Sequence, residues 1–236
     1  MAATATVRIW KTARVVAIRD ETATAKTFRF ALDEPSPHGA GQHYVIRLTA
    51  EDGYTASRSY SIASPPDDSL EFELTVERLE DGEVSMFLHD VVEVGDELEV
   101  RGPIGGWFVW DGATPVILVG GGSGVVPLMS MLRLARNEGR SDLVRLVVSI
   151  RKPADLYYAR ELPGPETTII YTRESPPGDA RPPGRLRVDD LAHLYRPGTT
   201  AYVCGSSGFA DAASTLLVDL GVPVDHIRVE RFGPTS

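Results

Sequence analysis

The first half of the chain alternates hydrophobic and polar residues with a period of two. This alternation is typical of strands that bury one face, and the glycine, proline and aspartate residues between the segments predict turns. A single helix is expected at residues 83–91, "EVSMFLHDV". Strands are expected within residues 14–32, 41–54, 57–64, 69–82 and 95–109. Short strands joined by turns predict an antiparallel β-barrel or sandwich.

The second half changes to continuous apolar runs that alternate with segments of helical spacing. Apolar runs ending in glycine are typical of strands buried on both faces of a parallel sheet. The expected strands lie at residues 115–122, 143–151, 166–174 and 199–207, and the expected helices at residues 125–139 and 208–221. This order predicts a doubly wound α/β domain, so we divide the chain into residues 1–110 and 111–236.

Composition and charge exclude several classes of function. The 236 residues are 42% hydrophobic and carry a formal net charge of −9, which argues against binding to nucleic acid. Cys204 is the only cysteine, so this chain alone supplies neither a disulfide nor a four-cysteine iron–sulfur cluster, and no metal site is expected from the scattered histidines. Without a signal-like or membrane-length apolar run, we expect a cytoplasmic protein with no membrane insertion.

A glycine-rich loop follows the first expected strand of the second half. The stretch "LVGGGSGVVPL" places Gly121, Gly122, Ser123 and Gly124 at the mouth of a helix. Glycines there allow a ligand to approach the backbone, and the free N–H groups with the helix dipole favour a pyrophosphate. The loop is neither a phosphate loop of the G-K-S/T type nor a nucleophile elbow. A tight turn without a ligand is the alternative.

The stretch "RSYSIAS" joins a cation, an aromatic ring and hydroxyl groups in one strand. Residues two apart on a strand share a face, so Arg58 and Tyr60 are expected to point to the same side. Taken alone, the segment is also compatible with a solvated edge strand.

Five motifs in order resemble the ferredoxin-NADP reductase superfamily. They are the R-x-Y-S pattern at residues 58–61, the G-x-x-S pattern at residues 82–85, "GGGSGVVP", "YVCGSSG" and the terminal "ERF". The resemblance spans residues 10–233. It implies a flavin-binding barrel of Greek-key type followed by a nicotinamide-nucleotide domain.

The resemblance also implies roles for residues of the first half. Arg58 would pair with the pyrophosphate of FAD, Tyr60 would lie against the isoalloxazine ring, and Phe232 would cover its other face. FAD is preferred to FMN because the arginine and the helix start together suit a pyrophosphate. Further cofactor-binding positions are Ser59, Ser61, Gly82, Val84 and Ser85.

The expected catalytic set is Ser61, Cys204 and Glu230. By resemblance, Ser61 donates toward flavin N5, Cys204 packs against the nicotinamide, and Glu230 orients it or relays a proton. A small buried hydrophobic residue is the alternative for Cys204. Thr172 and Arg173 resemble a 2′-phosphate site.

The coenzyme preference therefore leans to NADPH over NADH. Arg151 and Arg181 are possible further contacts to the 2′-phosphate. A solvated arginine in a polar loop is the alternative for this site.

The implied activity is hydride transfer from NAD(P)H to FAD, with electrons passed to a separate acceptor protein. That partner would be a ferredoxin, an oxygenase component or a cytochrome, and the protein is expected to be a monomer. The alternatives are a reductase of free flavin, ferric chelates or quinones, and a redox-sensing regulatory subunit without catalysis.

Overall fold

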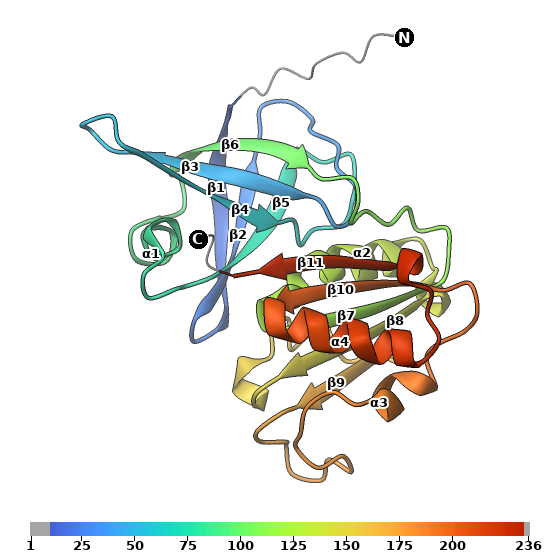
Figure 1. The fold of residues 1–236 in the computed structure, drawn as a ribbon. Coiled ribbons are helices and arrows are strands. Elements are labelled where there is room, and N and C mark those ends of the chain that lie inside the picture. The colour runs from blue at the N-terminus through green and yellow to red at the C-terminus, as the bar shows by residue number, and fades with distance from the viewer. Residues whose placement is uncertain (1–9, 234–236) are drawn as a thin grey trace.

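The computed structural model describes residues 10–233, which form two β-sheets in succession (Figure 1). The first sheet has six antiparallel strands in the order β4-β3-β6-β1-β2-β5. Its strands are β1 (Lys11–Thr22), β2 (Ala25–Ala31), β3 (His43–Thr49), β4 (Thr55–Ser61), β5 (Glu71–Glu77) and β6 (Glu97–Ile104). One helix, α1 (Glu83–Asp90), contacts β3, β4 and β5.

The first sheet curves into a barrel. A bridge between Ile62 and Leu74 brings its two edge strands, β4 and β5, together. Alternate residues of each strand fill the interior, where the rings of Tyr44 and Phe72 stack with centroids 4.2 Å apart. The structure confirms the antiparallel barrel and the helix predicted at residues 83–91.

The second sheet has five parallel strands in the order β11-β10-β7-β8-β9. Its strands are β7 (Val116–Gly121), β8 (Val144–Ile150), β9 (Thr167–Tyr171), β10 (Thr200–Ser206) and β11 (Ile227–Phe232). The α-helices are α2 (Val125–Asn137), α3 (Val188–Ala192) and α4 (Ser207–Asp219). The 3-10 turns are η1 (Gly122–Gly124), η2 (Ser141–Leu143), η3 (Pro153–Asp155) and η4 (Val224–His226).

Helices cover both faces of this parallel sheet (Figure 1). Along β7, Leu118 packs in the cluster that contains α2, whereas Ile117 and Val119 pack with α3 and α4. Burial on both faces explains why β7 is apolar at every position before its glycines. The doubly wound domain is therefore confirmed, with β11 added as a strand that the apolar pattern did not single out.

The connection between the sheets runs from Ile104 to Val116. Within it, Trp110 forms a bridge to Ala40 of the barrel, and its indole N–H donates to the carbonyl of Thr114 at 3.0 Å. The division between residues 110 and 111 stays a prediction. Among the described residues, no helix is long and apolar enough to cross a membrane.

Candidate functional site

The strand β4 presents the predicted flavin-side residues. Arg58 is exposed, and its guanidinium donates to the neighbouring carbonyl of Ser57 at 2.8 Å. Tyr60 is half-buried against the barrel core, and burial raises the pKa of its phenol. Ser61 is buried at the end of the strand, and Ser59 is exposed. The strand thus offers a cation and a ring near each other.

The start of α1 lies beside this strand. Gly82 is its N-cap residue in an extended conformation, and no side chain caps the helix. The hydroxyl of Tyr54 donates to the Glu83 carboxylate at 3.1 Å. Glu83 raises the pKa of the Tyr54 phenol, and the positive charge of Arg58 partly offsets this effect. Tyr54 therefore links the first turn of α1, which carries the Glu83 carboxylate, to the neighbourhood of Arg58, and the uncapped N–H groups of the helix start are suited to an anion.

The hydroxyl of Ser85 is engaged within the turn that precedes α1, and its predicted contact with the cofactor stays a prediction. Its hydroxyl donates to the Gly82 carbonyl at 3.0 Å and accepts from the Leu79 N–H at 3.1 Å. A Cβ at Gly82 would lie 2.3 Å from the Ser85 oxygen, so the turn needs glycine. Ser85 therefore shapes the turn, and the side chain of Val84 is fully buried, which leaves backbone N–H groups as the donors.

The glycine loop, residues 120–124, joins β7 to α2. A Cβ at Gly124 would lie 2.2 Å from the carbonyl oxygen of Cys204, so the loop touches the end of β10 directly. Gly122 has a φ of +56° and no atom within 4 Å of its Cβ position. The loop is therefore tightly held at Gly124 and open at Gly122, where a ligand could approach.

The predicted pair Cys204 and Glu230 meets beside this loop. Cys204 is fully buried in β10, where it pairs with Gly120 on one side and Glu230 on the other. Burial raises the pKa of Glu230 to about 7. Burial, and then the Glu230 charge, raise the pKa of the Cys204 thiol well above its usual value. The carboxyl group can therefore exchange a proton near neutral pH, whereas the thiol stays protonated.

Phe232 ends β11, next to Ser206, and is half-buried against the cluster that contains Cys204. By resemblance to the family, Phe232 is predicted to cover the face of the flavin ring that lies opposite Tyr60. That role remains a prediction.

The predicted coenzyme-selecting residues lie at the other edge of the parallel sheet. The N–H of Arg173 donates to the carbonyl of Arg151 at 2.9 Å, so these two arginines are neighbours beyond the ends of β8 and β9, and both are exposed. Thr172 adjoins them and is half-buried. A nucleotide touching both these residues and Glu230 would have to extend along the carboxyl ends of the strands, across the glycine loop.

Arg181 is held in place by its own loop. It forms a two-pronged ion pair with Asp190 at 2.7 and 2.8 Å and donates to the carbonyl of Arg185. Its guanidinium is therefore engaged in fixing this segment, unlike those of Arg151 and Arg173.

Tyr157 is a residue that the sequence reasoning missed. Its side chain is 4% exposed, and its hydroxyl has no hydrogen-bond partner within the described chain. Glu77 of β5 raises the pKa of the Tyr157 phenol and Ser123 of the glycine loop lowers it, after the larger effect of burial. The phenol therefore lies between β5 and the glycine loop, within reach of the Glu77 and Ser123 side chains, and a ligand held at the loop would meet it there. An aromatic residue in "DLYY" gives no local signal for this role.

No cluster of side chains that could hold a metal ion occurs among residues 10–233.

Comparison with known proteins identifies both halves. Residues 12–109 match the family model of the oxidoreductase FAD-binding domain, and residues 118–215 match that of the oxidoreductase NAD-binding domain. The chain is 34% identical over 241 residues to the glycine betaine monooxygenase reductase subunit of Chromohalobacter salexigens, covering 94% of this chain and 64% of that protein. It is 29% identical over 233 residues to the reductase component of the naphthalene 1,2-dioxygenase/salicylate 5-hydroxylase systems of a Ralstonia species, covering 94% and 69%.

Solved structures agree with this assignment. The flavohem-like FAD/NAD binding domain of nitric oxide dioxygenase from Vibrio cholerae superposes with a TM-score of 0.84 at 26% identity, covering 95% of this chain and 99% of that one. Phthalate dioxygenase reductase shares the fold, with a TM-score of 0.76 at 21% identity, covering 96% and 69%. The chain belongs to the ferredoxin-NADP reductase superfamily, with an FAD-binding barrel and an NAD(P)-binding domain. It spans 64% of the length of the Chromohalobacter relative.

Proposed function

We propose that the protein is an NAD(P)H-dependent flavin reductase that delivers electrons to a separate acceptor protein, a ferredoxin or an oxygenase component. The relatives from Chromohalobacter and Ralstonia are named as reductase parts of oxygenase systems, which supports this acceptor class. FAD, when bound, accepts a hydride from the dihydronicotinamide and releases electrons singly. We also propose a cytoplasmic location, because NAD(P)H is a reductant of that compartment.

One observation carries the proposal. Groups far apart in the sequence converge at the carboxyl ends of adjacent strands: Gly120 and Gly124 of the glycine loop, Cys204 and Glu230. A nucleotide held at the loop would thereby meet a carboxyl group whose pKa is about 7. Glu230 would orient the nicotinamide or exchange a proton with the solvent, and Cys204 would pack beside it.

The barrel residues would hold the flavin. Arg58 and the first turn of α1 would bind the diphosphate, because the guanidinium is exposed and the helix N–H groups lack a side-chain cap. Tyr60 would lie along the ring, and Ser61 would donate toward its reactive edge. Phe232 would cover the opposite face.

Coenzyme choice would depend on Arg173 and Arg151, with Thr172. Both residues are exposed, and their backbones are joined by a hydrogen bond, so two cations from neighbouring positions would be available to the additional phosphate of NADPH. Replacing Arg173 with alanine should lower the preference for NADPH over NADH roughly tenfold to a hundredfold, the value of one charge-assisted contact. Equal kcat/KM ratios in both proteins would contradict this site.

Anaerobic mixing tests the proposed function. The FAD-loaded protein should lose its visible flavin absorbance when NADPH or NADH is added, and should then reduce a ferredoxin or an oxygenase component. Faster turnover with free flavin, ferric chelates or quinones than with any protein acceptor would instead assign a small-molecule reductase. A protein that neither binds FAD nor oxidises NAD(P)H would contradict the proposal.

A further inference from the structure

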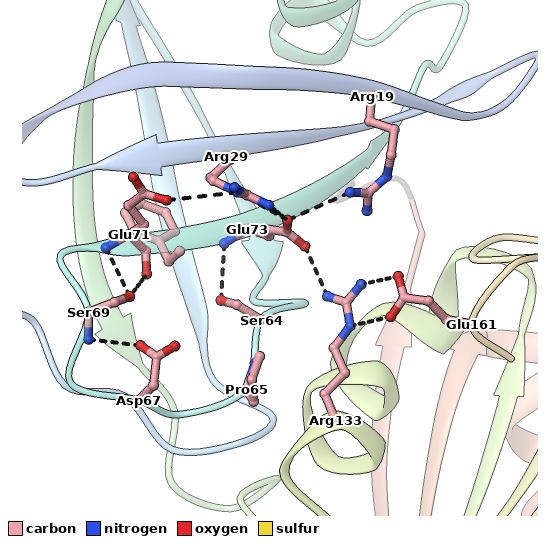
Figure 2. Close-up of a pocket in the computed structure, with 11 residues that line it drawn as sticks. Arg19, Arg29, Ser64, Pro65, Asp67, Ser69, Glu71, Glu73, Arg133 and Glu161 are labelled. Carbon is pink, nitrogen blue, oxygen red and sulfur yellow. Dashed lines mark hydrogen bonds and ion pairs between the residues drawn. The ribbon is translucent and has the colours of Figure 1, made fainter. Parts of the chain in front are cut away.

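An ion-pair network joins the two domains beside the segment that follows β4. Glu73 of β5 is nearly buried and is contacted by three guanidiniums, from Arg133 of α2 at 3.0 Å, Arg29 at 3.1 Å and Arg19 at 3.8 Å. Figure 2 shows Arg133 reaching from its helix toward Glu73, between the barrel strands and Glu161. Arg133 is the member of this network that crosses from one domain to the other.

Arg133 also holds the chain directly after β4. Its guanidinium donates to the carbonyl of Ala63 at 2.9 Å, and the Ser130 hydroxyl, from the same helix, donates to the carbonyl of Ser64 at 2.7 Å. The N–H of Ala63 in turn donates to the carbonyl of Glu73 at 2.8 Å. The segment that follows Ser61 is therefore fastened to α2 and to β5 at once.

The helix α2 begins at the glycine loop, where Gly124 is its N-cap residue. Because a helix is stiff over such a length, a shift of the loop relative to the barrel must also move Arg133 and Ser130. The two hydrogen bonds thus connect the predicted nicotinamide site to the predicted flavin strand through one rigid element.

A second connection runs through Tyr158. Its hydroxyl donates to the Thr75 hydroxyl at 2.6 Å, and its N–H donates to the Glu21 carboxylate at 3.1 Å. Its φ of 51° is unfavourable for a residue with a side chain, and the Arg133 guanidinium lies 5.2 Å from its ring. Tyr158 is held in this conformation by the barrel, by Arg133 and by its own segment, where the N–H groups of Glu161 and Leu162 donate to its carbonyl at 2.8 and 2.9 Å.

Beside the apolar cluster that joins Ala25 and Ala63 of the barrel to α2 and Tyr158, the seam has a polar side at this network. A cleft of about 430 Å³ lies there, lined mostly by charged and polar groups that include Arg19, Arg29, Ser64 and Glu161 (Figure 2). Polar contacts with fixed geometry therefore add a directional restraint to the apolar packing of the two domains on this side.

We propose that Arg133, assisted by Ser130, is a positioning residue that sets the distance between the hydride donor at the glycine loop and the flavin on β4. This inference rests on the proposed function. Reaction rates are sensitive to such a distance, since a misplacement of about 1 Å can cost on the order of a hundredfold. Arg133 touches neither the glycine loop nor β4, so it would act through the orientation of the domains.

Arg133→Met tests this role because it keeps the length of the side chain and removes every donor. Glu73 would keep Arg29 and Arg19 as partners, and Glu161 is 39% exposed, so neither carboxylate would be left buried and unpaired. Arg29→Met is the matched control, since it removes a partner of the same Glu73 from within the barrel. Arg133→Lys and Ser130→Ala are milder variants that serve if Arg133→Met does not fold.

The FAD-loaded proteins are mixed anaerobically with NAD(P)H. Arg133→Met should lower the limiting rate of flavin reduction about tenfold to a hundredfold, with the affinities for FAD and NAD(P)H within about threefold of wild type. Arg29→Met should change each quantity by less than about threefold. Ser130→Ala and Arg133→Lys should fall between the two.

Hydrogen–deuterium exchange at the Tyr158 amide gives a readout that does not depend on activity. It should speed up at least about tenfold in Arg133→Met and stay unchanged in Arg29→Met. A wild-type rate of flavin reduction or wild-type exchange in Arg133→Met would overturn the inference. If wild type itself is not reduced by NAD(P)H, the proposed function fails, and a positioning role in hydride transfer fails with it, whatever the exchange shows.

Discussion

The two candidate ligand regions are built in opposite ways. On the barrel, Arg58 is exposed, and within residues 10–233 its guanidinium makes a single hydrogen bond, to the carbonyl of the neighbouring Ser57. Its other N–H groups are therefore available to a ligand. In the second domain, Gly124 lies so close to the Cys204 carbonyl that no side chain fits between them. The glycine loop is therefore shaped by the contacts of its own backbone, whereas the Arg58 site depends on a free guanidinium in addition to the backbone N–H groups of α1. Substitutions in the glycine loop should therefore be sensitive to the volume of the new side chain, and substitutions at Arg58 to its charge.

The largest effect is expected from Gly124→Ala. The added Cβ would lie 2.2 Å from the Cys204 oxygen, so the loop or the end of β10 must shift. The free energy of unfolding should fall by about 2–4 kcal/mol in urea denaturation. Gly208→Ala is the control, because no atom lies within 4 Å of its Cβ position. A Gly124→Ala protein as stable as this control would show that the loop is not held by close contact.

Arg58→Ala should separate ligand binding from stability. The apo protein should unfold with a free energy within about 0.5 kcal/mol of wild type, because the side chain is exposed. The affinity for FAD, measured by titration of flavin fluorescence, should fall roughly tenfold to a hundredfold through loss of a charge-assisted contact. Arg58→Lys should recover part of it. If the affinity of Arg58→Ala for FAD equals that of wild type, Arg58 does not bind the diphosphate.

Glu230 predicts a pH dependence of stability. Its pKa is raised from 4.5 to about 7, so between these values the folded protein holds a proton that the unfolded chain has lost. Stability should therefore fall as the pH rises through this window, and the loss should be complete above it.

Glu230→Gln removes this titration. The variant should be more stable than wild type by about 1–2 kcal/mol at pH 8 and no more stable at pH 5. Glu174→Gln, at an exposed carboxylate, is the control with the same change in charge. An identical pH dependence of unfolding in wild type and Glu230→Gln would contradict burial of the carboxyl group.

The last prediction concerns the reactivity of Cys204 and involves no change in stability. Because burial raises the pKa of its thiol, iodoacetamide should label the native protein at least about a hundredfold more slowly than the urea-unfolded protein. Mass spectrometry of timed samples measures both rates. Rapid labelling of the folded protein would mean that the end of β10 opens readily, and would weaken the contrast between the two regions.

Local patterns predicted the architecture because strand and helix periodicities depend on which faces are buried. The apolar run before the glycine loop and the helix at residues 125–139 correspond to β7 and α2, and Cys204 and Glu230, chosen from motifs, lie opposite each other on β10 and β11. The strand β11 was missed because its burial is only partial at most positions.

Long-range contacts could not be read from the sequence. Nothing near Arg133 indicates that it meets Glu73 and Ala63, which lie sixty and seventy positions away. Likewise, the pattern at Gly82 and Ser85 located the turn, but only the structure shows that the serine hydroxyl is used within it. When a side chain has several possible hydrogen-bond partners, only the three-dimensional structure shows which of them it uses.

A crystal structure of the protein with FAD would show whether the barrel residues hold the flavin. We expect the diphosphate at the start of α1 beside Arg58, with the flavin ring between Tyr60 and Phe232. FAD bound in the cleft beside Arg29 and Glu73 instead, with Tyr60 free of contact with the ring, would contradict it.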